Sequence, residues 1–201
     1  MIKLLAATGN AGKLREFDRI LSPLGIEVIS PAMAGVVAQA EETGHTFAEN
    51  AYIKAMEMFE KTGLPAVADD SGLCVDALDG APGVYSARYR GAEAPYTVKN
   101  AALLEELREV PPERRTARFH CAICCIWDKT TVLCAEQTCE GVIGYEPSGS
   151  GGFGYDPIFY VGNVSFAALN AEKKDTISHR GKALRKFAEI LSRQMENKET
   201  V

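Results

Sequence analysis

The sequence predicts an α/β fold built on a mixed β-sheet. In the N-terminal half, short apolar runs alternate with amphipathic segments, a pattern typical of strands connected by helices. In the C-terminal half, segments 114–127 and 131–142 are rich in β-branched, aromatic and Cys residues and flank Asp128-Lys129, which indicates a long antiparallel hairpin. A hairpin does not fit a purely parallel sheet, so a mixed sheet is favoured.

Hydrophobic spacing and helix-end signals define the N-terminal elements. Thr46, with Glu49 three residues later, matches a capping box at a helix start. Ser22-Pro23-Leu24-Gly25 ends the preceding helix, whose apolar residues recur at helical spacing. We predict strands at 2–7, 26–29 and 66–68, helices at 13–21 and 46–61, and a loop up to Gly44.

The C-terminal elements are separated by Gly and Pro residues. Gly80-Ala81-Pro82-Gly83 breaks the chain, and Pro111-Pro112 ends a helix. We predict a strand at 72–78, a helix at 97–110, a Gly-rich loop at 145–155, a strand at 157–161, a helical turn at 169–174, a helix at 179–195 and a frayed tail at 196–201.

Length and charge limit the class of protein. The 201 residues suit one domain spanning 1–201, with 46% hydrophobic and 24% charged residues. The net charge of -5 argues against a protein that grips long nucleic acid, but it allows a locally basic pocket for a small anion. No apolar run approaches the roughly 20 residues of a membrane helix. The N-terminus enters a strand without a signal-peptide cleavage region, so we expect a cytoplasmic protein with no membrane partner.

Six cysteines raise the question of a zinc site, since Cys121 and Cys124 form a C-x-x-C spacing. On a strand, Cys121 and Cys125 point to one face and Cys124 to the other. We therefore expect buried structural thiols in a reducing compartment. A zinc-stabilised interaction protein is the alternative.

Acidic residues follow the predicted strand at 66–68. Asp69-Asp70 is succeeded by Ser71 and Gly72, and carboxylates at a strand end suit a divalent cation whose other ligands come from a substrate phosphate. A capped turn is the alternative. Glu41-Glu42 either completes this acidic cluster or lies in a solvated loop.

A second candidate site lies between the first strand and the first helix. The stretch consists of Thr8, Gly9, Asn10, Ala11, Gly12 and Lys13. Backbone N–H groups at such a helix start suit phosphate, and Lys13 adds a full charge. The spacing is not that of a Walker A loop, and a plain tight turn is the alternative.

Two further motifs carry aromatic and basic residues. In Gly151–Pro157, glycines permit close backbone approach, Phe153 offers a ring for stacking and Asp156 an acceptor for a ring N–H. Ser178 suits a helix N-cap, after which His179 and Arg180 supply donors to an anion or a base edge. The alternatives are a mobile loop and a cap with two exposed polar residues.

In this order, the motifs resemble the Ham1/RdgB-like family of inosine triphosphate pyrophosphatases. The resemblance covers nearly the whole chain. The matching stretches are Thr8–Lys13, Glu42–Gly44 with Thr46-Phe47 and Glu49–Ala51, Ala68–Leu73, Gly80–Gly83 with Ser86–Tyr89, Gly152–Pro157 and Ser178–Gly181.

The resemblance implies an elongated mixed α/β fold, with a long sheet flanked by helices and two lobes around a central cleft. It implies a homodimer that uses Mg²⁺. The implied reaction is hydrolysis of ITP, dITP and XTP to the monophosphate and pyrophosphate, which cleanses the nucleotide pool.

The resemblance also implies roles for individual residues. Asp70 is the implied catalytic acceptor and a metal ligand, with Glu41 or Glu42 as the second acid. A nucleotide-binding module without turnover is the alternative function. The implied substrate-binding residues are Thr8, Gly9, Asn10, Ala11, Gly12, Lys13, Ser71, Phe153, Gly154, Tyr155, Asp156, Lys174, His179 and Arg180.

Overall fold

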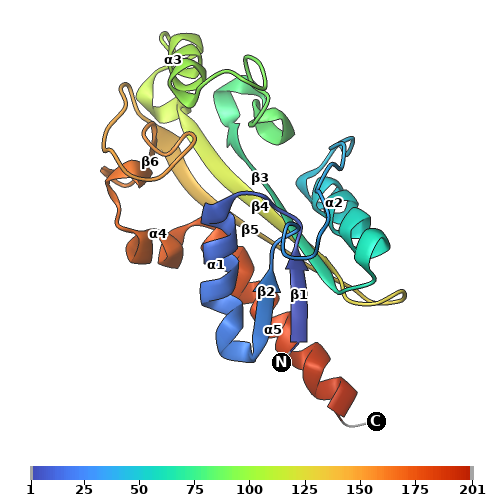
Figure 1. Ribbon diagram of the computed structural model, residues 1–201. Helices are drawn as coiled ribbons and strands as arrows, with labels where there is room; N and C mark the ends of the chain where they lie inside the picture. Colours follow the sequence, from blue (N-terminus) through green and yellow to red (C-terminus); the bar gives the residue numbers. More distant parts are fainter. Residues whose placement is uncertain (1, 200–201) are drawn as a thin grey trace. The chain divides into compact units, whose positions relative to one another are not determined.

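The computed structural model describes residues 2–199, with side chains described as far as residue 196. Its sheet has the strand order β2-β1-β3-β4-β5-β6-β7 (Figure 1). β1 pairs in parallel with β2 and β3, whereas β6 pairs antiparallel with β5 and β7, so the predicted mixed sheet is confirmed. The strands are β1 (Ile2–Ala6), β2 (Ile26–Ile29), β3 (Ala66–Val75), β4 (Thr116–Ile126), β5 (Val132–Ile143), β6 (Phe159–Val161) and β7 (Val164–Ser165).

Five α-helices are found within residues 2–199, together with short 3₁₀ turns. The capping box at Thr46 and Glu49 is present as predicted, because each residue's side chain accepts from the other's backbone N–H. No helix in this range is both long and apolar enough to cross a membrane. The α-helices are α1 (Ala11–Leu21), α2 (Phe47–Thr62), α3 (Tyr96–Glu106), α4 (Ala171–Ile177) and α5 (His179–Glu199).

The chain divides into two compact units. The first holds the residues up to Asp70, Cys121–Gln137 and the residues from Gly181 onward. The second holds Ser71–His120 and Thr138–Arg180. The expectation of one domain over 1–201 stays a prediction, and we describe each unit separately.

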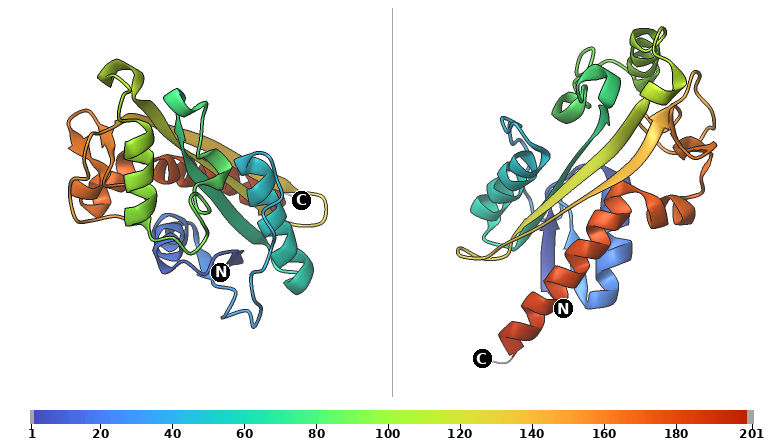
Figure 2. Two further views of the ribbon diagram at one scale, coloured as in Figure 1. Left: turned by 90° about the horizontal axis from the view of Figure 1, so that it is seen from above. Right: turned by 180° about the vertical axis from the view of Figure 1, so that it is seen from behind.

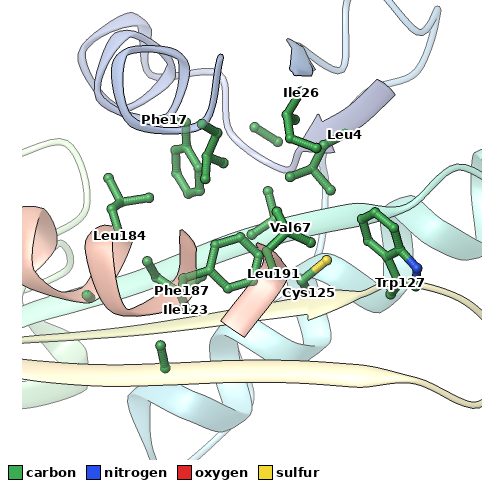
Figure 3. Close-up of a cluster of buried hydrophobic side chains, with 14 of the residues drawn as sticks. Leu4, Phe17, Ile26, Val67, Ile123, Cys125, Trp127, Leu184, Phe187 and Leu191 are labelled. Carbon is green, nitrogen blue, oxygen red and sulfur yellow. The ribbon is translucent and has the colours of Figure 1, made fainter. Parts of the chain in front are cut away.

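The first unit has a core on each face of its strands. On one face, α1 and α5 lie side by side, and Phe17 and Phe187 pack toward Val67 (Figures 2 and 3). On the other face, α2 packs Ala55 and Met58 against the strands. Because strand side chains alternate, Val67 belongs to the first core while its neighbours Ala66 and Ala68 belong to the second.

The second unit is held by an aromatic cluster. Phe119 and Phe159 meet edge to face with ring centroids 4.6 Å apart, and Phe159 meets Phe166 at 4.8 Å. Leu73 of β3 and Leu103 of α3 are fully buried in the same core. This core supports the loops that precede β6 and α4.

The main correction to the predicted elements concerns β3. A strand was expected at 66–68 and another from 72, with the acid pair following the end of the first strand. The structure has one strand, Ala66–Val75, that runs through Asp69 and Asp70. The acids do not end the strand because each carboxylate has a lysine partner, at Lys13 and Lys54 respectively. Two adjacent acids can therefore lie within a buried strand when each has a lysine partner.

Smaller corrections concern helix ends and one short strand. α1 begins at Ala11 rather than 13, since the Asn10 side chain caps it by accepting from two backbone N–H groups. α3 ends at Glu106 rather than 110, because Arg115 and the Val110 N–H bind the Leu107 carbonyl. The predicted turn at 169–174 is a helix over Ala171–Ile177, and the two-residue β7 was not predicted. α5 continues to Glu199 beyond the predicted 195; residues 200–201 of the expected frayed tail lie outside the described range.

The cysteine prediction is correct about the faces and wrong about two thiols. Cys121 and Cys125 lie in the core beneath α5, whereas Cys124 lies on the other face against the Ala48 carbonyl. Cys124 and Cys134 form a disulfide, with Cα atoms 4.4 Å apart on the neighbouring strands β4 and β5. Because its sulfur is bonded to Cys134, Cys124 does not offer a thiolate to the zinc site that the C-x-x-C spacing had suggested as an alternative.

We expect Phe187→Ala to lower the free energy of unfolding by about 3–5 kcal/mol, because the ring is fully buried and its removal leaves a cavity. Chemical denaturation followed by circular dichroism measures the change. Lys186→Ala on the exposed side of α5 is the control and should stay within about 0.5 kcal/mol of the parent. A loss below about 1 kcal/mol for Phe187→Ala would contradict the packing described for this core.

Candidate functional site

The two acids of β3 are directed to opposite faces of the strand. Asp69 pairs with Lys13 of α1 (Nζ to Oδ2, 2.9 Å), and Asp70 pairs with Lys54 of α2 (Nζ to Oδ1, 2.8 Å). Successive side chains on a strand alternate, so each helix meets one acid. Three acids and the two lysines that pair with them form what we call the acidic group: Glu42, Asp69, Asp70, Lys13 and Lys54.

Lys54 lies between two carboxylates. Its ammonium also donates to Glu42 Oε1 at 2.9 Å, while Asn50 Nδ2 donates to Asp70 Oδ2 at 3.3 Å. Burial lowers the pKa of Lys54, but Asp70, Asp69 and Glu42 outweigh it and the pKa is raised. Lys54 is therefore a cation at neutral pH.

The pKa of Asp70 is raised, chiefly because the carboxyl is buried, and the Glu42 charge adds to this. Lys54 acts in the opposite direction. Burial, rather than a neighbouring charge, is the leading cause of this shift in the pKa of Asp70.

Glu42 and Asp70 form a donor set that fits a hard divalent cation. Both carboxylates already face one positive charge, the Lys54 ammonium. Oxygen ligands are those that Mg²⁺ prefers, and it often binds through one or two carboxylates plus substrate phosphates. Residues 2–199 contain no cluster of three or more His, Cys, Asp or Glu side chains arranged to hold a metal. Glu41 is exposed, whereas Glu42 is the one bonded to Lys54.

The predicted phosphate loop lies where β1 leads into α1. The Asn10 side chain accepts from the N–H groups of Gly12 and Lys13, at 2.8 and 3.3 Å, and Thr8 Oγ1 accepts from the Asn10 N–H at 3.1 Å. Three loop amides are therefore bonded within the loop. Lys13 extends from the first turn of α1 to Asp69.

Tight packing fixes the chain just before α2. The Asn50 side-chain oxygen accepts from the Gly44 N–H at 2.8 Å, so one amide group joins this loop to Asp70. A Cβ at position 44 would lie 2.6 Å from Glu49 Cβ and 2.8 Å from Asn50 Oδ1. Glycine is the residue that fits there.

In the second unit, Phe153 is contacted by two cations. Lys174 Nζ lies 4.7 Å from the ring centroid, and the Arg180 guanidinium lies 5.5 Å from it. The ring is 47% exposed, so it remains open to a ligand. Lys174 also pairs with the buried Asp156 at 2.5 Å. We call Gly151–Pro157 the base loop, after the role that the sequence predicts for it.

Asp156 shapes the base loop from inside. Its Oδ2 accepts from the Phe153 N–H at 2.7 Å. Gly152 has φ +70°, and a Cβ there would lie 2.2 Å from Asp156 Oδ2, so a side chain would strain the turn and displace the acid. Gly154 also has a positive φ, of 68°.

His179 and Arg180 begin α5 directly after Ser178, as predicted. The His179 ring stacks on Phe119 at 4.7 Å and is buried. Arg180 Nη2 donates to Ser71 Oγ at 2.9 Å. Ser71, Phe153, Lys174 and Arg180 are thus brought together within the second unit.

Sequence reasoning missed two sets of supporting residues. Asn50 and Lys54 contact Asp70, and their i,i+4 spacing on α2 is the signal that could have identified them. In the second unit the missed residue is Asn100, whose Nδ2 donates to the Gly154 carbonyl at 3.2 Å. Tyr155, which was predicted as a site residue, is buried, and its OH donates to the Ser86 carbonyl at 2.9 Å. No spacing in the sequence indicates those contacts, since their partners are backbone carbonyls.

Comparison with known proteins gives a consistent result. The sequence model of the Ham1 family matches residues 4–190. A curated relative from Desulforamulus reducens, named dITP/XTP pyrophosphatase, is 52% identical over 194 residues and 96% of both chains. A relative of the same name from Escherichia coli K12 is 47% identical, covering 95% of this chain and 98% of its own. A solved HAM1 protein from Coxiella burnetii superposes with a TM-score of 0.89 at 42% identity, over 96% of this chain and 100% of the other. The chain belongs to the Ham1 family.

Proposed function

We propose that this protein hydrolyses the non-canonical purine nucleoside triphosphates ITP, dITP and XTP to the monophosphate and pyrophosphate. The observation that carries the proposal is that two carboxylates, Asp70 and Glu42, share the Lys54 ammonium as a partner. The neighbouring acid on the same strand as Asp70, Asp69, pairs with Lys13. The family relatives named dITP/XTP pyrophosphatase support it. A homodimer and a cytoplasmic location belong to the same expectation.

The triphosphate binds at the acidic group in this proposed reaction. Hydrolysis between the α and β phosphates requires in-line attack by water and stabilisation of charge on phosphate oxygens. Asp70 accepts a proton from this water or orients it, and the ammonium groups of Lys13 and Lys54 oppose the developing negative charge. A Mg²⁺ ion held by Asp70 and Glu42 would supply further electrostatic stabilisation.

The purine binds at the base loop in this proposed reaction. Phe153 offers its ring for stacking, and His179 and Arg180 offer N–H donors. Inosine and xanthosine carry a carbonyl at C6, where adenine carries an amino group. A site built to hydrogen-bond one group strongly rejects a ligand that lacks it, because buried donors are left unpaired.

A panel of nucleoside triphosphates with Mg²⁺ tests the reaction. We expect pyrophosphate release from ITP, dITP and XTP and little from ATP, measured with separate assays for pyrophosphate and orthophosphate. Release of orthophosphate alone would assign the wrong bond and would contradict the proposal.

Asp70→Asn separates an enzyme from a binding module. We expect kcat to fall by about a thousandfold, because the proton acceptor is lost, while ITP binding measured by calorimetry persists. Asp79→Asn, on an acid outside the acidic group, is the matched control and should keep the parental kcat. If Asp70→Asn turned over ITP like the parent, Asp70 would not be the catalytic acceptor.

Lys54→Met tests the charge balance of the acidic group. We expect the free energy of unfolding at pH 7 in EDTA to fall by about 3 kcal/mol, since Asp70 and Glu42 lose their shared partner. The raised pKa of Lys54 means that its contribution is complete below the unfolded lysine pKa and is lost only as alkaline pH passes the folded value. At neutral pH the full deficit should therefore be visible.

Two further conditions sharpen this test. At acidic pH the deficit should shrink, because the pKa of Asp70 is raised and a protonated Asp70 no longer needs the Lys54 charge. Added Mg²⁺ should raise the Tm of Lys54→Met more than that of the parent, because the ion takes the place of the ammonium. Equal Mg²⁺ shifts in the two proteins would argue against Asp70 and Glu42 as the cation ligands.

A further inference from the structure

The loop before α2 has no regular secondary structure, yet side chains of α2 hold it by its backbone. We call residues 37–45 the acidic loop, because it carries Glu41 and Glu42. The Glu57 carboxylate accepts from the N–H groups of Gln39, at 3.2 Å, and Ala40, at 2.9 Å. Lys61 Nζ donates to the Val37 carbonyl at 3.0 Å and to Glu57 Oε1 at 2.6 Å. We call this arrangement the Glu57–Lys61 clip.

The clip belongs to one polar stripe along α2. Residues 50, 54, 57 and 61 are spaced by four, three and four, so they share a face of the helix. Their partners in the loop occur in the reverse order, so the loop runs antiparallel to the helix. The pairs are Asn50 with Gly44, Lys54 with Glu42, Glu57 with Ala40, and Lys61 with Val37.

Charge strengthens the clip. Burial opposes ionisation of Glu57, but hydrogen bonds from Lys61 and from the Gln39 and Ala40 amides outweigh it, and the pKa of Glu57 is lowered. An ionised carboxylate that accepts backbone N–H groups forms charge-assisted hydrogen bonds, which are stronger than neutral ones. Glu57 is therefore a firm anchor at neutral pH.

Glu42 depends on this anchor. It lies two residues beyond Ala40, and its own bond is to the Lys54 ammonium. A cation that takes the place of this ammonium would remove the Lys54–Glu42 contact, whereas the contacts at Ala40 and Gly44 would remain. Those two contacts then hold the backbone on either side of Glu42.

We infer that the Glu57–Lys61 clip is a positioning device that presents the Glu42 carboxylate to a divalent cation shared with Asp70. This inference rests on the proposed function. A loop fixed in advance binds a ligand more tightly, because less conformational entropy is lost when the ligand arrives. Glu57 and Lys61 do not touch the cation and act only through the backbone of the acidic loop.

Glu57→Ala is the principal test. We expect the affinity for Mg²⁺, measured by calorimetry without nucleotide, to weaken by about tenfold, as for other residues that orient metal ligands. The Mg²⁺ concentration for half-maximal ITP hydrolysis should rise in parallel, while kcat at saturating Mg²⁺ stays within about twofold of the parent. The amides of Gln39 and Ala40 should exchange hydrogen faster.

Matched variants separate positioning from general damage. Glu60→Ala removes an exposed acid from the same helix and should leave Mg²⁺ affinity unchanged. Glu57→Gln keeps an acceptor oxygen and should recover part of the affinity lost in Glu57→Ala. Lys61→Met removes the donor to Val37 and should weaken Mg²⁺ binding in the same direction; these two variants decide the question if Glu57→Ala does not fold.

The outcomes are distinguishable. Faster exchange at Gln39 and Ala40 with unchanged Mg²⁺ affinity would overturn the inference, and so would unchanged exchange in Glu57→Ala. If kcat at saturating Mg²⁺ fell in Glu57→Ala by as large a factor as the Mg²⁺ affinity, Glu57 would have only a structural role and the inference would be overturned. If the parent protein itself bound no Mg²⁺ and hydrolysed no ITP, the proposed function would fail first, and with it the basis of the inference.

Discussion

The ion pair between Lys54 and Asp70 sets the character of the acidic group. Asp70 is buried on a core strand, where an ionised carboxylate is unfavourable without a partner. Lys54 compensates for that burial and also draws in Glu42 from a loop with no regular structure. One ammonium thus determines where two carboxylates lie, and the acidic loop and α2 are arranged around it.

α2 serves both the core and the acidic group. Its apolar side packs Ala51, Ala55 and Met58 as buried residues, which fixes the helix against the strands. Its polar stripe then faces the acidic loop. A loop alone is a poor support for a charged ligand, because its backbone has many conformations. Backbone hydrogen bonds to a rigid helix reduce that freedom without adding secondary structure to the loop.

Much of the fold could be predicted from local signals. The Thr46 capping box, the hairpin at 127–131 and the start of α5 after Ser178 depend on neighbouring residues, and local chemistry specified them. The strand from 66 was predicted to end at 68, because the apolar run stops where Asp69-Asp70 begins. The strand continues because lysines from two different helices pair with the acids, and such partners lie far away in the sequence.

In the candidate site, too, some residues are indicated by their neighbours in the sequence and others only by partners that lie far away in it. Asp70, Lys13 and the base loop belong to compact motifs and could be identified from residue type and order. Glu57 could not, and Lys54 was missed despite its spacing from Asn50, because a charged residue on an amphipathic helix is usually solvated and its partner is set by tertiary packing. The Cys124–Cys134 disulfide was missed for a related reason, since pairing depends on strand register rather than on spacing.

The antiparallel match between the acidic loop and α2 also bears on how the chain tolerates insertions and deletions. Surface loops usually accept changes of length at small cost. Here an added residue between Ala40 and Gly44 would shift one anchor relative to the other, and Glu42 would no longer face Lys54. A change of length in the turn at 31–35, which precedes the first anchor, would leave the spacing between Ala40 and Gly44 unchanged. Length variation in this segment should therefore accumulate before Val37 and be excluded from the stretch that follows it.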